Sequence, residues 1–218
     1  DKAVSMDRLL EAMKADWKGY EDVQQLLLNA PKYGNDDDYA DTIAAAVHHK
    51  TSEVLARSKN RFGYSLRGDG SGISVTYGAG AMVPATPDGR KSGDPLSDAT
   101  LSPGFGADQN GPTAVLNSAA KISTEKTYNH LLNQKFHPSS LEGEMEGVFA
   151  SYLRSWGDLD ISQIQFNVVD RETLLDAQIN PEKHADLLVR VAGYSAYFVD
   201  LSKGLQDSII NRNEMSFK

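Results

Sequence analysis

The chain has 218 residues, carries 22 Lys+Arg against 30 Asp+Glu for a formal net charge of −8, and contains no cysteine. The lack of cysteine excludes disulfides, zinc–thiolate sites, protein-ligated iron–sulfur clusters and a cysteine nucleophile within this chain. Because 40% of the residues are hydrophobic and 24% are charged, we expect a soluble globular protein with one sizeable domain or two small ones. The acidic balance disfavours nucleic acid as a partner. No stretch approaches the about 20 apolar residues of a membrane-spanning helix, so we expect no membrane partner either.

The first 60 residues are predicted to be helical because their apolar residues recur at helical spacing. Two stripes carry this pattern: Leu9, Leu10, Met13 and Trp17, then Val23, Leu26 and Leu27. Ser5 is predicted to cap the first helix, and the acidic run 36–38 to open a third helix that reaches about Leu55. The start, Asp1–Ser5, is neither a signal peptide nor an initiator methionine, so we expect processing or a piece of something longer.

Residues 63–111 are rich in glycine and proline, and we expect extended chain and loops there. Within this stretch, Ile73–Tyr77 alternates well enough to predict a strand, and Thr86–Arg90 has the Pro-Asp-Gly order of a turn. Further along the chain, the pattern predicts helices over 114–122, 144–153 and 172–178, a short one from Pro181, and a last one from Ser202 to about 212. A buried strand is predicted over 164–169, with Asp170 as the cap of the following helix. The alternation favours an α/β arrangement with too few strands to close a barrel alone.

Several motifs look chemical, but each is better explained by ordinary structure. Gly68–Gly72 resembles a phosphate loop, yet a flexible loop or hairpin is the simpler interpretation. His48 and His49 are adjacent and therefore point about 100° apart on a helix, so we expect a solvated face and no metal site. His137 and His184 have no Asp, Ser or Cys partner at motif spacing. We interpret the three acids Glu142, Glu144 and Glu146 as a solvated first helical turn.

A glycine near the C-terminus is set in an apolar, β-prone segment, 188–198. Strand interiors usually avoid glycine, so a bulge or tight turn is one explanation for Gly193. The segment Arg190-Val191-Ala192-Gly193-Tyr194, however, resembles the Arg-Val-x-Gly-Tyr signature of the glycyl radical enzyme family.

Five other blocks resemble the same family, in the family's order. They are 29–37, 85–96, 111–116, 165–169, and 173–178 with the following 180–183. The resemblance covers nearly all of the chain and is closer to the dehydratase, lyase and decarboxylase branches than to pyruvate formate-lyase. It implies the C-terminal half of an α/β barrel of about ten strands, in which residues 1–160 are the half-barrel portion with a helical N-terminal segment and residues 161–218 are the glycyl radical domain. The stretch 77–83 would then be a candidate for the barrel floor.

The resemblance implies that Gly193 is the catalytic residue, whose α-hydrogen is removed to leave a backbone radical, with Arg190, Val191, Ala192 and Tyr194 as its neighbours in the radical loop. A radical at Cα is stabilised when that carbon flattens and shares spin with the flanking amide groups. Glycine has no Cβ to oppose this geometry. We expect the apolar neighbours Val191, Ala192, Tyr194 and Phe198 to exclude water and oxygen.

The resemblance also implies partners, because the family's radical glycine exchanges hydrogen with a cysteine that lies upstream of everything this chain resembles. We therefore expect a Cys-bearing chain that completes the barrel in a hetero- or homo-oligomer, or a chain that is a cut-down piece of the full enzyme. A separate activating enzyme with S-adenosylmethionine and an iron–sulfur cluster would install the radical, so this chain would bind no cofactor and no metal. The expected substrate is a small organic molecule, and the expected location is the cytoplasm or a bacterial microcompartment.

Two rival functions remain open at this point. One is a repair protein that restores an oxygen-cleaved glycyl radical enzyme, although the length of the chain before Gly193 favours a catalytic part. The other is an α/β binding module in which Gly193 is only a turn. The reaction itself is left open between dehydration, C–N, C–S or C–C cleavage, and addition to fumarate.

Overall fold

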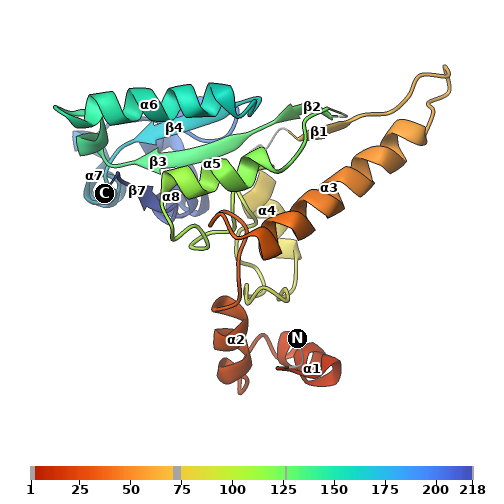
Figure 1. Cartoon of the computed structure of the whole chain (residues 1–218). Coiled ribbons are helices and arrows are strands. Elements are labelled where there is room, and N and C mark those ends of the chain that lie inside the picture. The colour runs from red at the N-terminus through yellow and green to blue at the C-terminus, as the bar shows by residue number, and fades with distance from the viewer. Residues whose placement is uncertain (1–2, 71–74, 126, 218) are drawn as a thin grey trace. The chain divides into compact units, whose positions relative to one another are not determined.

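The computed structural model describes residues 3–70, 75–125 and 127–217, and the chain divides into two compact units (Figure 1). The smaller unit comprises 1–31 and 75–96, and the larger unit comprises 32–74 and 97–218. Neither unit ends at the boundary after residue 160 that we predicted between two domains, and that boundary stays a prediction.

The described residues of the smaller unit form three helices, α1 (Met6–Lys14), α2 (Glu21–Leu28) and α4 (Val75–Met82). The predicted cap of α1 is confirmed, because the Ser5 hydroxyl accepts a hydrogen bond from the Arg8 N–H at 3.3 Å. A small core forms around Trp17, whose indole N–H donates to the Arg90 carbonyl at 3.0 Å. The predicted apolar stripes are only partly buried, since Leu10 and Leu26 are exposed.

The strand predicted over Ile73–Tyr77 is wrong where the structure describes it. Residues 73 and 74 lie outside the described part, and Val75 begins helix α4. Local β-propensity is overridden by packing here: Gly80 lies so close to the backbone of Asp94 and Pro95 that a Cβ would clash with the Asp94 carbonyl. The predicted barrel-floor segment 77–83 is therefore mostly helical as well.

The larger unit holds five α-helices within its described residues, most of them near the predicted places. They are α3 (Asp38–Arg57), α5 (Pro112–Ala120), α6 (Met145–Asp158), α7 (Arg171–Ile179) and α8 (Lys203–Ile210), with short 3₁₀ turns η1 (Pro138–Leu141), η2 (Pro181–Lys183) and η3 (Phe198–Asp200). The acidic run does open α3, since the Asp37 carboxylate accepts from the Tyr39 N–H at 2.9 Å. Asp170 caps α7 as predicted.

Three small sheets form among the described residues of the larger unit. The central one is parallel, in the order β4 (Ile164–Val168), β3 (Leu132–Phe136), β7 (Glu214–Met215). The second pairs β1 (Gly68–Gly70) with β2 (Thr127–His130) in parallel, and the third pairs β5 (Leu188–Arg190) with β6 (Ser195–Tyr197) in antiparallel fashion. Strand β4 confirms the strand predicted over 164–169, but its buried side chains are the polar Gln165 and Asn167, and Val168 is exposed. The glycine-rich loop expected at 68–72 is instead a strand over 68–70, and 71–72 lie outside the described residues.

The core of the larger unit is built on Phe136, a fully buried residue of β3. Its ring contacts the rings of Phe149 and Tyr152 on α6, Phe166 on β4 and Phe217 near the C-terminus, with centroids 5.3–5.9 Å apart. Helices α6 and α5 flank this sheet (Figure 1). The aromatic cluster thus fixes β4, and with it the polar side chains that β4 presents to the loop described next.

A second core joins the C-terminal elements to one another. It gathers buried residues of β5, η3, α7 and α8 and of the segments just after β4 and β5: Val169, Leu174, Ala177, Val189, Val191, Phe198, Ile209 and Ile210. This cluster anchors both strands of the β5–β6 hairpin. Among the described residues, no helix combines the length and the apolar character needed to cross a bilayer.

Candidate functional site

Gly193 lies at the tip of the hairpin formed by β5 and β6. Arg190 pairs with Ser195 across the two strands, and the Val191 N–H donates to the Tyr194 carbonyl at 2.9 Å, which closes the turn. The backbone of Gly193 has a φ of +78°, a left-handed conformation that side chains with a Cβ rarely adopt. The turn geometry therefore favours a glycine here on conformational grounds.

The apolar neighbours of Gly193 bury one side of the tip. Val191 and Ala192 are 2% exposed and Phe198 is fully buried, as expected. Tyr194 is 38% exposed and Gly193 itself is exposed in this chain, and the shielding of the glycine from water and oxygen stays a prediction. Within this chain, one side of the hairpin tip is buried and the other side, which carries Gly193, is exposed to solvent.

Gln165, a buried residue of β4, contacts the glycine directly. Its side-chain Oε1 accepts one hydrogen bond from the Gly193 N–H at 3.1 Å and another from Arg190 Nε at 3.0 Å. Arg190 in turn donates from its guanidinium to the Ser195 hydroxyl at 3.2 Å. The side chain of Arg190, one of the predicted loop neighbours, thus braces both ends of the turn.

Asn167, two residues further along β4, holds the same loop at its start. Its Nδ2 donates to the Arg190 carbonyl at 2.6 Å and its Oδ1 accepts from the Arg190 N–H at 2.7 Å. Residues two apart on a strand point to the same face, which is why Gln165 and Asn167 both reach the hairpin.

Arg212, just after α8, also binds the backbone of the loop. Its guanidinium donates to the carbonyls of Arg190 at 3.1 Å and Val191 at 2.6 Å. The buried Asp98 carboxylate lies 2.5 Å from Arg212 Nε and supplies the opposite charge. Nearby, burial and the Asp98 charge raise the pKa of Asp108 to about 6.

Sequence reasoning named the loop but missed these contacts. Gln165 and Asn167 stood in a block that resembles the family, yet they were assigned no role, and neither Asp98 nor Arg212 was singled out. One usable signal was the polar–apolar alternation of Gln165-Phe166-Asn167 within a strand predicted to be buried.

The histidines differ from their predicted surroundings. His49 is exposed as expected, but His48 Nε2 lies 2.8 Å from Nε2 of the fully buried His130. Burial, and secondarily the nearby His48, lowers the pKa of His130 to about 4. His184 does have an acidic partner, Asp176 at 2.7 Å, and His137 contacts the Ser139 hydroxyl at 2.7 Å.

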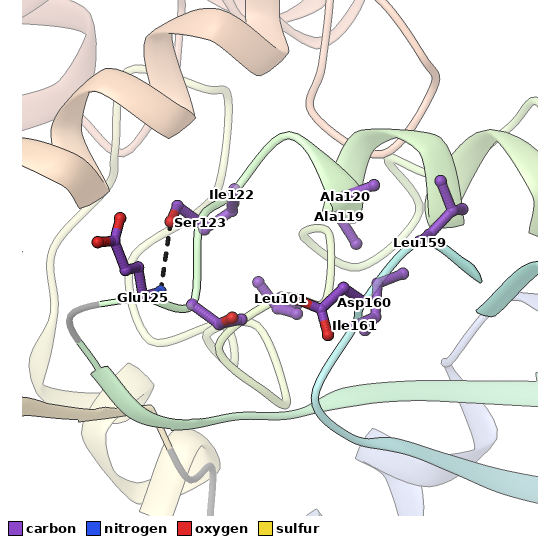
Figure 2. Close-up of a pocket in the computed structure, with 10 residues that line it drawn as sticks. Leu101, Ala119, Ala120, Ile122, Ser123, Glu125, Leu159, Asp160 and Ile161 are labelled. Atoms are coloured by element: carbon purple, nitrogen blue, oxygen red, sulfur yellow. Dashed lines mark hydrogen bonds between the residues drawn. The ribbon is translucent and has the colours of Figure 1, made fainter. Parts of the chain in front are cut away.

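The remaining candidate motifs show no chemistry. The three acids Glu142, Glu144 and Glu146 are exposed around the start of α6, as predicted. In the part of the chain that the structure describes, no three His, Asp or Glu side chains gather as metal ligands. A cavity of about 390 Å³ lies between the C-terminal end of α5 and the turn from α6 to β4, with Glu125 and Asp160 on its wall (Figure 2). Its walls include no residue of the hairpin.

Two family models match the chain. The model described as "Glycine radical" matches residues 98–199, which include Gly193, Gln165 and Asn167. The model described as "Pyruvate formate lyase-like" matches residues 1–80.

Curated relatives are similar over almost the whole chain. Isethionate sulfite-lyase of Bilophila wadsworthia is 42% identical and the match covers 97% of this chain and 26% of the relative. Indoleacetate decarboxylase of Tractidigestivibacter scatoligenes is 40% identical over 89% of this chain and 22% of the relative.

Solved structures agree in fold. Hydroxyproline dehydratase from Clostridioides difficile matches with a TM-score of 0.94 and 43% identity, covering 99% of this chain and 28% of that one. The B12-independent glycerol dehydratase from Clostridium butyricum also matches with a TM-score of 0.94, at 41% identity, covering 100% of this chain and 28% of that one. The chain therefore has the α/β fold of these enzymes and spans about a quarter of the length of the relatives it matches.

Proposed function

Because the chain belongs to the glycyl radical enzyme family, we propose that it is the radical-bearing C-terminal part or subunit of a glycyl radical lyase of the dehydratase type. The observation that carries this proposal is the position of Gly193. It lies inside the region that matches the glycine radical model, at a hairpin tip that is clamped on one side and open on the other. In this proposal residues 1–160 serve as scaffold and residues 161–218 as the radical domain.

The proposed chemistry is a hydrogen exchange. The Gly193 Cα radical takes a hydrogen atom from a cysteine S–H supplied by another chain or by the rest of a longer protein, which leaves a closed-shell glycine and a thiyl radical. The thiyl radical then takes a hydrogen atom from a small organic substrate. A separate activating enzyme that uses S-adenosylmethionine and an iron–sulfur cluster would install the radical, and the hairpin would have to move outward to meet it. We propose the cytoplasm, or a bacterial microcompartment within it, as the location.

A stripe of exposed apolar side chains supports the idea that more protein completes this fold. Tyr39, Ile43, Val47 and Val54 lie at helical spacing along α3 and each is more than half exposed. Such a stripe is costly in water and typical of a surface that a partner covers. We propose that the Cys-bearing part of the barrel covers it, in a hetero- or homo-oligomer or within a single longer chain.

The names of the relatives indicate the class of reaction. Three of the names refer to isethionate, hydroxyproline and glycerol, which are small polar organic molecules, and a fourth refers to indoleacetate. We therefore propose a lyase or dehydratase substrate of this kind. The alternative function, a spare part that repairs an oxygen-cleaved enzyme, requires only the last stretch around the glycine, whereas the matches here extend back to residue 1.

Electron paramagnetic resonance tests the proposal. Anaerobic incubation with a cognate activating enzyme and the Cys-bearing partner should give a doublet from a single α-hydrogen, and incorporation of α-deuterated glycine should collapse that doublet. Gly193→Ala should abolish the signal. Gly147→Ala is the matched control, since Gly147 lies in α6 with open space where a Cβ would be placed.

Two outcomes would contradict the proposal. A doublet that survives Gly193→Ala would show that the radical lies on another residue. A signal unaffected by deuterated glycine would exclude a glycyl radical. If the chain instead restores activity only to an enzyme already cleaved by oxygen, and forms no active complex with an intact Cys-bearing partner, the repair function is correct.

A further inference from the structure

The side-chain amide of Gln165 is oriented unambiguously by its neighbours. Its Oε1 faces two donors, the Gly193 N–H at 3.1 Å and Arg190 Nε at 3.0 Å. Both of these groups can only donate, because a peptide nitrogen and a guanidinium have no acceptor. The reverse orientation would set an NH₂ group against two N–H groups, so the atom facing the glycine has to be the oxygen.

Gln165 is also rigidly held. It is 6% exposed and its backbone pairs in register with Asn133 of β3, within the central sheet. The loop before the glycine is held as well, because Asn167 and Arg212 bind the backbone of Arg190, and Arg212 also binds the Val191 carbonyl. The direction of the Gly193 N–H is therefore set by β4 rather than by the hairpin alone.

The other end of the same amide gives the second observation. Gln165 Nε2 is buried and has no hydrogen-bond partner among the described residues. A buried donor without a partner destabilises a fold, so Nε2 offsets part of the stability that the hydrogen bonds of Oε1 contribute. Among the described residues, this buried amide therefore makes its side-chain hydrogen bonds through the oxygen, and both go to the Gly193 loop.

Building on the proposed function, we propose that Gln165 is a positioning residue that aligns and polarises the peptide nitrogen of Gly193. A Cα radical is stabilised when the nitrogen lone pair is shared with the half-filled orbital, which requires a flat, oriented peptide. An acceptor on the N–H increases electron density at that nitrogen and strengthens the sharing. Arg190, on the same oxygen, keeps the acceptor in place.

Three variants of the complete, activated assembly test this role, each labelled with ¹⁵N-glycine. Gln165→Met removes the acceptor at nearly constant volume, and Gln165→Glu keeps an acceptor next to Arg190. Gln163→Met is the matched control, since Gln163 lies just before β4 and its carboxamide oxygen contacts Asn129 rather than the hairpin. We measure the ¹⁵N hyperfine coupling of the doublet and the amount of radical per protein.

We expect Gln165→Met to change the ¹⁵N coupling and to lower the radical yield about fivefold, the factor that one net hydrogen bond contributes to an equilibrium. Gln165→Glu should restore both towards wild type, and Gln163→Met should alter neither. If Gln165→Met does not fold, Gln165→Asn, which withdraws the oxygen by one methylene, should give the same loss.

The inference is overturned if removal of the acceptor leaves the ¹⁵N coupling unchanged, or if Gln165→Glu loses the radical as fully as the acceptor-free variant. These results differ from failure of the proposed function. In that case the wild-type protein itself shows no glycyl doublet, whatever residue stands at position 165.

Discussion

Asn167 acts as a strand partner for Arg190 through its side chain rather than its backbone. Both of its side-chain hydrogen bonds are to the Arg190 peptide groups, at 2.6 and 2.7 Å, and the residue is buried. Asn167→Ala would leave the half-buried Arg190 N–H without this partner. We expect a loss of about 2 kcal/mol in the free energy of unfolding, measured in urea, and faster hydrogen exchange at the Arg190 amide. Asn129→Ala, which removes one long bond of 3.4 Å, should cost much less. Equal losses would contradict this assignment.

His130 predicts a specific pH dependence of stability. Its pKa is lowered from 6.5 to about 4 by burial and by His48, so the unfolded chain binds the proton more tightly than the folded one. The neutral histidine contributes stability that is complete above pH 6.5 and is lost as the pH falls towards 4, by about 3 kcal/mol at most. His130→Gln should flatten this slope in unfolding curves collected across that window, whereas His49→Gln should leave it as in wild type. A slope that persists in His130→Gln would show that other groups cause it.

At the scale of elements, Phe136 makes β3 the central strand of the larger unit. Its ring contacts α6, β4 and the C-terminal segment at once. Phe136→Ala should destabilise the protein by about 3–5 kcal/mol, because it leaves a cavity where several aromatic rings meet. Phe62→Ala, at a residue that is 67% exposed, is the control and should stay close to wild type in thermal unfolding. Similar melting temperatures for the two variants would refute a central role for this cluster.

The elements that the sequence could predict are those whose signal is local. Helix α3 begins directly after its acidic cap, and α7 begins directly after its cap, Asp170. Strand β4 was predictable because its apolar residues Ile164, Phe166 and Val168 alternate at strand spacing. Strand β3 was not, because Asn133, Gln134 and Lys135 look like surface residues, yet all are buried in the central strand of the sheet. The helix at Val75 was missed because the packing of Gly80 that favours it comes from residues 94–95.

The residues of the candidate site also fall into those that a local sequence signal reveals and those that only the fold reveals. Gly193 and its neighbours could be found from a contiguous motif, since the family resemblance lies in five adjacent residues. The contacts of Gln165, Asn167 and Arg212 link residues 21–28 positions apart, and only the fold brings them together. Sequence spacing carries no information about such pairs unless both strands are already placed.

At the scale of the whole molecule, the apolar stripe on α3 should decide assembly. Val47 is 63% exposed, so Val47→Glu should leave the stability of this chain unchanged. If the Cys-bearing part of the barrel covers the stripe, the same change should abolish complex formation in anaerobic size-exclusion chromatography. Lys50→Glu, on the same helix, should bind as wild type. Normal binding by Val47→Glu would mean that the partner docks elsewhere.

The segment after Gly193 pairs with and packs against the rest of the larger unit. Strand β6 pairs with β5, α8 packs into the second core, and β7 extends the central sheet beside β3. A break in the backbone at Gly193 would therefore yield a nicked but still assembled protein. We expect oxygen-treated protein to keep its native elution volume and to release residues 194–218 only on a denaturing gel. If residues 194–218 instead elute separately under native conditions, covalent continuity is needed to hold the segment.

If the cleaved segment stays in place, the broken backbone is hidden within a protein of native size. A replacement for the severed segment would first have to displace the old one.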